Sequence, residues 1–464
     1  MSVVPQTSSV VPQAAGSTAL RFPTGFVWGA ATASFQIEGS TRADGRVDSI
    51  WDVFCRRPGA VANGDSGDPA ADHYRRYEQD IELMSTLGLG AYRFSIAWPR
   101  LANLGFYDRL VDCLLERGIA PWATLYHWDL PQSLEDEGGW TNRDTAYRFA
   151  EYAAAAVGRL GDRVSGWLTL NEPWCAAFLG YGNGVHAPGV QDPRAAVAAT
   201  HHLLLGHGLA MSEIRAAAPD VPAGITLNLF PVRPATDSEA DLDAARRIDG
   251  LQNRIFLDPV LRGEYPADVL ADLAPFGLPE LVHDGDLGVI SAPVDLLGIN
   301  YYRAYLVSAD DAVDGPSEWP GSSDVRFLQS GHPKTEMDWE VQPDGLTDLL
   351  VSLTRDYPGV PLYVTENGAA YPDTFTEDGQ IRDTDRIAFL DGHLRASHAA
   401  IEKGADLRGY FCWTLLDNLE WAEGYSKRFG LVHVDFGTQK RTLKESARWY
   451  ANVIGNNGLP AAEG

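Results

Sequence analysis

Eight short runs rich in β-branched and aromatic residues recur along the chain, and longer segments with a helical period separate them. Strands that alternate with helices in this way are typical of βαβ units around a parallel sheet. No linker rich in Pro, Gly and Ser is long enough to divide the core into two domains. A doubly wound sheet is disfavoured, because the G-x-G-x-x-G motif typical of that fold does not follow the first run. The sequence therefore predicts an α/β fold, a single (β/α)8 TIM barrel. We expect its strands at residues 26–31, 91–97, 121–126, 164–170, 224–229, 294–299, 362–365 and 409–414.

The segments between these runs show the amphipathic pattern of helices. Residues 141–161 place their apolar side chains on one helical face and end at a glycine that can cap a helix. That face comprises Phe149, Ala150, Ala153, Val157 and Leu160. We expect the barrel to span residues 21–455, with a flexible N-terminal arm at residues 1–20 and a flexible C-terminal tail at residues 456–464.

The chain is strongly acidic, with 37 Lys and Arg against 63 Asp and Glu and a formal net charge of −26. Such a charge repels nucleic acid and anionic membranes, so neither is an expected partner. No Lys or Arg and no sustained apolar run precede Arg21, so we expect neither a secretory signal nor a membrane anchor. Four separated cysteines and the lack of a glycosylation sequon agree with reduced thiols in a cytoplasmic protein. The sequence does not indicate an oligomeric state.

Unusual polar residues fall at the carboxyl ends of the expected strands, where barrel enzymes carry their catalytic groups. Buried polar groups need partners, so a shared substrate pocket would explain them together. The residues are Arg93, His127, Asn171, Glu172, Asn300, Tyr301, Tyr302, Glu366, Asn367 and Trp413.

Each of these residues also has a structural interpretation, because Asn171 or Glu366 could cap a helix and Arg93 could belong to a buried ion pair. Two glutamates at two strand ends, Glu172 and Glu366, are a more specific signal. Glycoside hydrolysis needs one carboxyl group to protonate the leaving oxygen and another to attack the sugar or activate water. The pair therefore indicates glycosidase chemistry.

Seven motifs in order make the chain resemble the family 1 glycoside hydrolases, the β-glucosidases and their relatives, from about residue 22 to residue 450. Seven matches in the correct order are far more specific than a single Asn-Glu-Pro. The motifs are FVWGAATASFQIEG at 26–39, YRFSIAWP at 92–99, TLYHWDLP at 124–131, TLNEP at 169–173, NYY at 300–302, VTENG at 364–368 and DNLEW at 417–421.

The resemblance implies a retaining double displacement with Glu172 as acid/base and Glu366 as nucleophile. Arg93 and Tyr302 match the residues that keep this nucleophile ionised and aimed, and Asn171 matches the residue that binds the sugar 2-hydroxyl. The expected chemistry agrees, because Glu172 must begin the reaction protonated and an ionised Glu366 nearby should hold its pKa high. The resemblance implies no metal and no cofactor.

The resemblance also implies a pocket for a neutral hexose, in which Trp413 forms a platform under the sugar ring. Trp174 and Trp339 match positions at the aglycone entrance. The expected substrates are small β-glucosides and cello-oligosaccharides, as in cellulose and polysaccharide degradation, with β-galactosides and β-fucosides as further candidates. The expected substrate-binding residues are Gln36, His127, Asn171, Asn300, Trp413, Glu420 and Trp421.

Three alternative functions are disfavoured by particular residues of the sequence. A 6-phospho-β-glucosidase is disfavoured because the Glu420 carboxylate would repel a phosphate. A non-catalytic sugar-binding relative should lack one of the two glutamates, and both are present. A thioglucosidase is disfavoured because position 172 holds glutamate and not glutamine.

Two further features bear on the site. His201, His202 and His207 lie in one expected helix, but their spacing is poor for a common face, so we interpret them as structural residues and not as metal ligands. Between Arg100 and Phe106 the chain has only residues 101–105, about a dozen fewer than the family usually has there. That shortening leaves the aglycone preference open.

Overall fold

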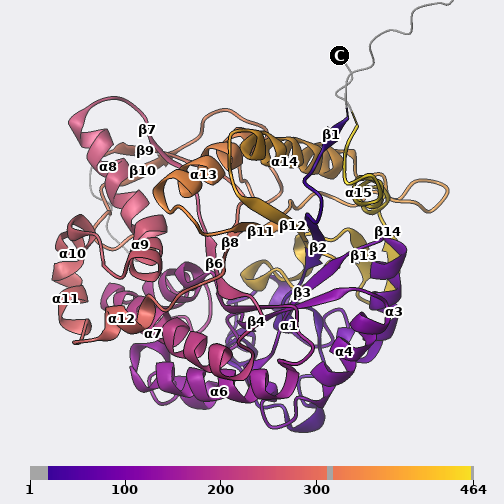
Figure 1. Ribbon diagram of the computed structural model, residues 1–464, viewed down its shortest axis with the longest axis horizontal. Helices are drawn as coiled ribbons and strands as arrows, with labels where there is room; N and C mark the ends of the chain where they lie inside the picture. Colours follow the sequence, from indigo (N-terminus) through magenta and orange to yellow (C-terminus); the bar gives the residue numbers. More distant parts are fainter. Residues whose placement is uncertain (1–18, 311–316, 461–464) are drawn as a thin grey trace, which may run out of the picture.

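The computed structural model describes residues 19–310 and 317–460. The expectations for the terminal segments at residues 1–18 and 461–464 lie outside these described residues. Within the described part, parallel strands close into a barrel and helices cover its outside (Figure 1). The predicted (β/α)8 TIM barrel is therefore confirmed.

Each expected strand is present in the barrel, within a few residues of its expected limits. The order around the barrel is β2, β3, β4, β5, β6, β8, β11 and β12, and the pairing of β12 with β2 closes it. The strands are β2 (Val27–Ala31), β3 (Ala91–Ser95), β4 (Ala120–Tyr126), β5 (Gly166–Asn171), β6 (Ala223–Asn228), β8 (Leu296–Asn300), β11 (Leu362–Asn367) and β12 (Leu407–Trp413).

Long helices follow most of the strands and pack on the outside of the barrel (Figure 1). The principal ones are α3 (His73–Thr86), α4 (Gly105–Glu116), α6 (Asp144–Leu160), α7 (Pro193–Ala217), α8 (Glu239–Asp249), α9 (Ile255–Arg262), α13 (Pro343–Asp356), α14 (Thr384–Glu402) and α15 (Glu445–Asn456). Shorter helices are α1 (Ser34–Ile37), α2 (Ile50–Cys55), α5 (Gln132–Glu135), α10 (Ala267–Leu273), α11 (Leu278–Leu281) and α12 (Asp286–Ile290).

Small accessory sheets lie beside the barrel. A three-stranded sheet joins β7 (Val232–Pro234), β9 (Tyr305–Ala309) and β10 (Val325–Leu328), and a hairpin joins β13 (Val432–Asp435) to β14 (Lys440–Leu443). The two ends of the described chain meet where β1 (Leu20–Arg21) pairs with β15 (Gly458–Leu459). Ordered pairing thus reaches one residue before and three or four residues after the barrel limits of 21 and 455 expected from the sequence.

The amphipathic pattern of residues 141–161 corresponds to α6, and its apolar face is buried except for Ala150, which is partly exposed. Phe149, the largest residue of this face, is fully buried. Its ring centroid lies 5.5 Å from that of Trp98, 5.9 Å from Trp140 and 6.0 Å from Tyr152. Interdigitated aromatic rings of this kind leave no room for relaxation, so the contact fixes α6 against the barrel.

We expect Phe149→Ala to lower the free energy of unfolding by about 3–5 kcal/mol, because removing the ring leaves a cavity in a close-packed core. Chemical denaturation would measure the change. Tyr147→Ala is the matched control, since Tyr147 lies on the same helix with 46% of its surface exposed. Equal losses in the two variants would show that Phe149 is not a core residue.

Candidate active site

A cavity of about 380 Å3 opens at the carboxyl ends of the barrel strands. The structure brings together there most of the site residues expected from the sequence. Those that line the cavity are His127, Glu172, Trp174, Tyr302, Trp339, Glu366, Trp413, Glu420 and Trp421. Arg93, Asn171 and Asn300 lie behind this lining and reach it through hydrogen bonds to Glu366, His127 and Glu172. Gln36 donates to the Leu419 carbonyl, next to Glu420 in the chain.

Glu366 lies at the end of β11 and is held by two donors. Arg93 Nη1 donates to Oε1 at 2.6 Å, and the Tyr302 hydroxyl donates to Oε2 at 2.8 Å. Burial raises the pKa of Glu366, whereas the Arg93 charge and the two hydrogen bonds lower it. With a cation and a phenol as partners, this carboxyl group is the one of the pair that ionises more readily.

Glu172 directly follows β5 and has neutral partners. The Asn300 amide donates to Oε1 at 2.6 Å, and the Cys175 thiol donates to Oε2 at 3.1 Å. Burial, followed by repulsion from the Glu366 carboxylate, raises the pKa of Glu172 to about 8. Since neutral donors stabilise a carboxylate less than a guanidinium does, Glu172 retains its proton while Glu366 is ionised.

Backbone strain is present at this position. Glu172 has a φ of 45°, in the left-handed region that non-glycine residues rarely adopt. Its own N–H donates to the Thr226 carbonyl on β6 at 3.0 Å, which holds the turn in place. Strained residues of this kind cluster at functional sites, where the surrounding structure pays the cost of aiming a side chain.

Asn171 and His127 form a second hydrogen-bonded pair. Asn171 Oδ1 accepts from Arg93 Nη2 at 2.6 Å and from Asn300 Nδ2 at 3.1 Å. The amide nitrogen of Asn171, Nδ2, therefore donates to His127 Nε2 at 3.0 Å. The imidazole must therefore carry its proton on Nδ1. Burial holds the pKa of His127 well below its usual value, so the ring is neutral.

Several buried polar atoms have no hydrogen-bond partner among the described residues, and three of them belong to residues expected to bind the sugar: Gln36 Oε1, His127 Nδ1 and Glu420 Oε2. Unsatisfied polar atoms are costly in a protein interior, and they are expected where a ligand supplies the missing partners. One donor and two acceptors suit the hydroxyl groups of a sugar. All three belong to the set that the sequence analysis assigned to sugar binding.

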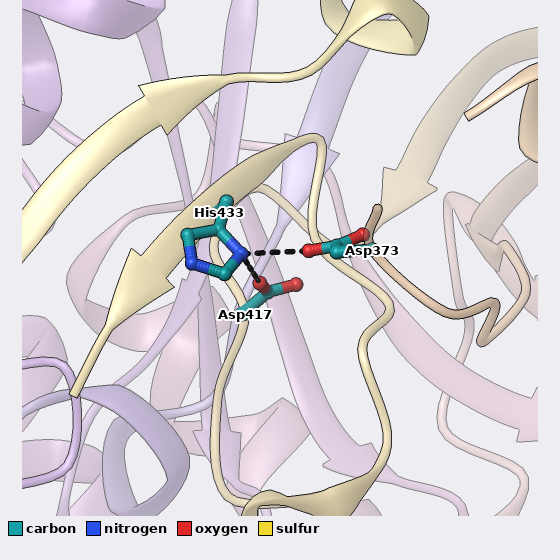
Figure 2. Close-up of side chains that lie close together, drawn as sticks. All are labelled: Asp373, Asp417 and His433. Atoms are coloured by element: carbon teal, nitrogen blue, oxygen red, sulfur yellow. Dashed lines mark hydrogen bonds and ion pairs between the residues drawn. The ribbon is translucent and has the colours of Figure 1, made fainter. Parts of the chain in front are cut away.

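The segment that carries Glu420 and Trp421 is anchored by a buried charge network that the sequence analysis did not identify. Lys444 Nζ lies 2.9 Å from Asp417 Oδ1 and 2.8 Å from Asp373 Oδ1. His433 Nδ1 lies 2.7 Å from the other Asp373 oxygen and 3.5 Å from Asp417 (Figure 2). Three groups could geometrically hold a cation here, but Lys444 bridges both carboxylates and Arg428 pairs with Asp417 at 2.9 Å, so side-chain cations already occupy this position. Asp417 thereby fixes the loop three residues before Glu420.

Trp174 and Trp339, which the resemblance assigns to the aglycone entrance, both line this cavity. The Trp339 ring is 5.3 Å from that of Tyr302, and the Trp174 ring is 5.1 Å from that of Trp319. The short segment at residues 101–105 does not contribute to the lining of this cavity.

Each of the three histidines of α7 has a different partner. His201 bonds to Tyr265 and Asp286, His202 to the Trp140 carbonyl and His207 to the Thr169 hydroxyl. All are buried and point in separate directions, as expected for structural residues.

Cys175 and Asn228 also line the cavity and were missed by the sequence analysis. Cys175 could have been found, because it lies three residues after Glu172, one helical turn away, and its thiol reaches the carboxyl group. Asn228 ends β6, a strand that carried no other signal, and its amide donates to Cys175 Sγ at 3.7 Å.

The barrel carries two buried carboxyl groups of different acidity at the carboxyl ends of its strands, beside buried donors and acceptors that could bind sugar hydroxyls. This combination defines the class of glycoside hydrolases. Residues 18–459 match the family described as glycosyl hydrolase family 1, and the chain belongs to that family. None of the described helices is long and apolar enough to cross a membrane.

Known proteins of this family are similar over nearly their whole length. The thermostable beta-glucosidase B of Thermobispora bispora is 52% identical, and the match covers 100% of this chain and 96% of that protein. The bifunctional beta-D-glucosidase/beta-D-fucosidase of Bifidobacterium breve is 48% identical over 94% of this chain and 98% of its own. The crystal structure of the psychrophilic beta-glucosidase BglU from Micrococcus antarcticus superposes with a TM-score of 0.92, at 50% identity, over 94% of this chain and 98% of that one.

If the reaction uses an ionised Glu366 and a protonated Glu172, the two carboxyl groups predict a bell-shaped pH dependence of kcat/KM. Activity should fall as the pH rises through about 8, where Glu172 loses its proton. Tyr302→Phe removes a donor to the ionised form of Glu366, so its pKa should rise and the acidic limb should move up by about one pH unit. An unchanged acidic limb in the pH profile of this variant would show that Tyr302 does not stabilise the Glu366 carboxylate.

Proposed function

We propose that this protein is a retaining β-glucosidase that releases terminal β-D-glucosyl residues, with Glu172 as acid/base and Glu366 as nucleophile. The observation that supports these roles is the difference between the two carboxyl environments. Arg93 and Tyr302 stabilise an ionised Glu366, whereas Glu172 has only neutral donors and a pKa raised to about 8. A nucleophile must start the reaction ionised and a general acid must start it protonated.

In the first step a Glu366 oxygen attacks the anomeric carbon and the bond to the leaving oxygen breaks. Glu172 transfers its proton to that oxygen, so the aglycone leaves as a neutral alcohol. In the second step Glu172, now a carboxylate, removes a proton from water, and the resulting oxygen attacks the anomeric carbon and breaks the ester bond to Glu366. Two inversions restore the original anomeric configuration.

The change in proton affinity between the two steps follows from charge. While Glu366 is ionised, its negative charge disfavours ionisation of Glu172. Once Glu366 is an ester, that repulsion is gone and the pKa of Glu172 falls, so the same group can act as a base. Arg93 remains in place between the nucleophile and Asn171 and can stabilise the carboxylate again when it is released.

A neutral hexose is the sugar that suits the unsatisfied atoms of the cavity. Gln36 Oε1 and Glu420 Oε2 can accept from hydroxyl groups, and His127 Nδ1–H can donate to one. Trp413 lies beside them with its ring stacked at 5.8 Å from that of His127, and can cover the apolar face of the sugar.

The substrates proposed are aryl and alkyl β-glucosides and cello-oligosaccharides, with β-fucosides as a second class. The relatives named above are β-glucosidases, and one of them is also a β-fucosidase. A 6-phosphoglucoside is disfavoured because Glu420 contributes a carboxyl group, and no basic side chain lines the cavity near it among the described residues except Arg303 at the mouth.

Glu420→Ala should lower kcat/KM for an aryl β-glucoside by at least about a hundredfold, or about 2.7 kcal/mol, because hydrogen bonds to sugar hydroxyls are lost in a buried site. Steady-state kinetics measure this directly. Glu151→Ala is the matched control, because Glu151 lies on α6 outside this cavity and its side chain is 67% exposed. Near-normal turnover by Glu420→Ala would remove Glu420 from the sugar site.

The two glutamates can be separated by azide products. Glu172→Ala should still form the glycosyl-enzyme from a dinitrophenyl glucoside, which needs no acid, and azide should then accelerate turnover and yield the β-glucosyl azide. Glu366→Ala cannot form the ester, so azide should attack from the opposite face and yield the α-azide. Product NMR distinguishes the anomers, and the same anomer from both variants would contradict the assigned roles.

A further inference from the structure

A second cavity, of about 250 Å3, adjoins the active site on its outer side. Arg303, Tyr305 and Trp339 line both cavities, so the two spaces share a wall. Trp339 in turn packs against Tyr302, the partner of Glu366, with ring centroids 5.3 Å apart. The second cavity therefore begins where the aglycone mouth of the active site ends, and it is too small for more than one small polar molecule.

The wall that the two cavities share contains a guanidinium group, that of Arg303, with N–H donors that remain free to bind a ligand. The Arg303 guanidinium lies over the rings of Tyr305 and Trp339, 4.9 Å and 5.2 Å from their centroids. Its Nη2 donates to the Tyr305 hydroxyl at 3.2 Å, and no other acceptor is recorded for it among residues 19–310 and 317–460. Two aromatic faces thus hold a planar donor group at the boundary of the two spaces, ready to bind oxygen atoms.

The opposite wall supplies an acceptor and an aromatic surface. Glu318 Oε2 accepts from Asn183 at 3.1 Å, and its other oxygen has no recorded partner in the described part of the chain. Trp319 is buried and links the two mouths, because its ring lies 5.1 Å from Trp174 and 5.2 Å from Phe327. Aromatic faces between paired donors and acceptors are the usual composition of a sugar-binding cleft.

The outer rim of this cavity is fixed before any ligand arrives. Buried Glu340 accepts from the backbone N–H groups of Ser330, Gly331 and His332 at 2.6–2.9 Å. Gln342 then bridges this rim to the strand end, since its Nε2 donates to Ser330 Oγ at 2.7 Å and its Oε1 accepts from the Ala304 N–H at 2.9 Å. A preformed wall lowers the entropy cost of binding.

Charge decides the class of ligand. Three carboxylates, from Glu318, Asp338 and Glu340, line this cavity together with the single Arg303 guanidinium. Asp338 pairs with Lys334 and Glu340 is bound by backbone N–H groups, so Glu318 and Arg303 remain as one charge of each sign. An anionic or a cationic aglycone would therefore be repelled by one of the two. A neutral polyhydroxyl group is the ligand that both signs of charge can bind through hydrogen bonds.

We propose that this outer cavity, built on Arg303, Glu318 and Trp319, is a binding subsite for the second sugar unit beyond the scissile bond of a neutral oligosaccharide. The proposal rests on the proposed function, because the catalytic cavity must hold the glycone and the first aglycone unit. It makes the enzyme an oligosaccharide hydrolase that prefers substrates of three or more units over disaccharides.

The test compares kcat/KM for cellotriose and cellobiose, and for laminaritriose and laminaribiose, with the purified full-length enzyme. We expect the wild type to favour the trisaccharide by about tenfold in at least one series, the effect of about one charge-assisted hydrogen bond. Arg303→Met retains the apolar stem against the two rings but removes the guanidinium, and should bring the ratio close to one. Glu318→Ala acts from the opposite wall and should lower the same ratio.

Arg408→Ala is the matched control, because Arg408 is exposed on β12 near the amino-terminal end of the barrel and pairs only with Asp406 among the described residues. It should retain the wild-type ratio in both series. The subsite is overturned if the wild type does not favour the trisaccharide in either series, or if Arg303→Met and Glu318→Ala both keep the wild-type preference. In those cases, hydrolysis of an aryl β-glucoside and cellobiose by the wild type would leave the proposed function intact, whereas inactivity on both would overturn the proposed function and the subsite together.

Discussion

The buried ion pair between Arg93 and Glu366 is the interaction on which the rest of the site depends. Arg93 comes from β3 and Glu366 from β11, and their side chains are 1% and 4% exposed. The same guanidinium donates to the Thr124 hydroxyl on β4 and to Asn171 on β5, so one side chain of β3 is bonded to three other strands of the barrel. Removing one member of such a pair typically costs about 3–5 kcal/mol, because the other charge remains buried without compensation.

This pair also explains why two glutamates in one cavity take different protonation states. If both were equally solvated and equally bonded, repulsion would raise the pKa of both without assigning roles. Arg93 breaks that symmetry, since its charge lies directly on Glu366, whereas the direct partners of Glu172 are Asn300 and Cys175. In the proposed mechanism, a single cation placed on one side of the site thus decides which carboxyl group attacks and which donates a proton.

The barrel and its loops contribute different parts of the function. The strand ends hold the reacting groups, and their positions are set by closed backbone pairing. The proposed sugar recognition depends on the segment with Glu420, which has no strand to support it and is fixed instead by the bonds from Asp417 to Lys444 and to the Gly430 N–H. The proposed outer subsite depends on the sheet of β9 and β10 and the rim that Glu340 ties down. The residues proposed for the reaction and those proposed to select substrate length therefore lie on different parts of the chain, as is common in barrels whose loops vary on a constant core.

The sequence by itself determined the barrel, because the alternation of short apolar runs with amphipathic segments is a local property of the chain. It also indicated the two glutamates and their main partners, since strand-end positions and seven ordered motifs can be read without coordinates. It did not indicate the Asp373, Asp417 and Lys444 network, the contact of Asn228 with Cys175, or the place of Arg303 between two rings. These features join residues far apart in the chain, or depend on where a side chain points, and neither leaves a periodic signal. The resemblance implied that Glu172 starts protonated, but only the tertiary structure supplied the physical cause, because a pKa depends on burial and on the distance to other charges, and both exist only once the barrel has closed.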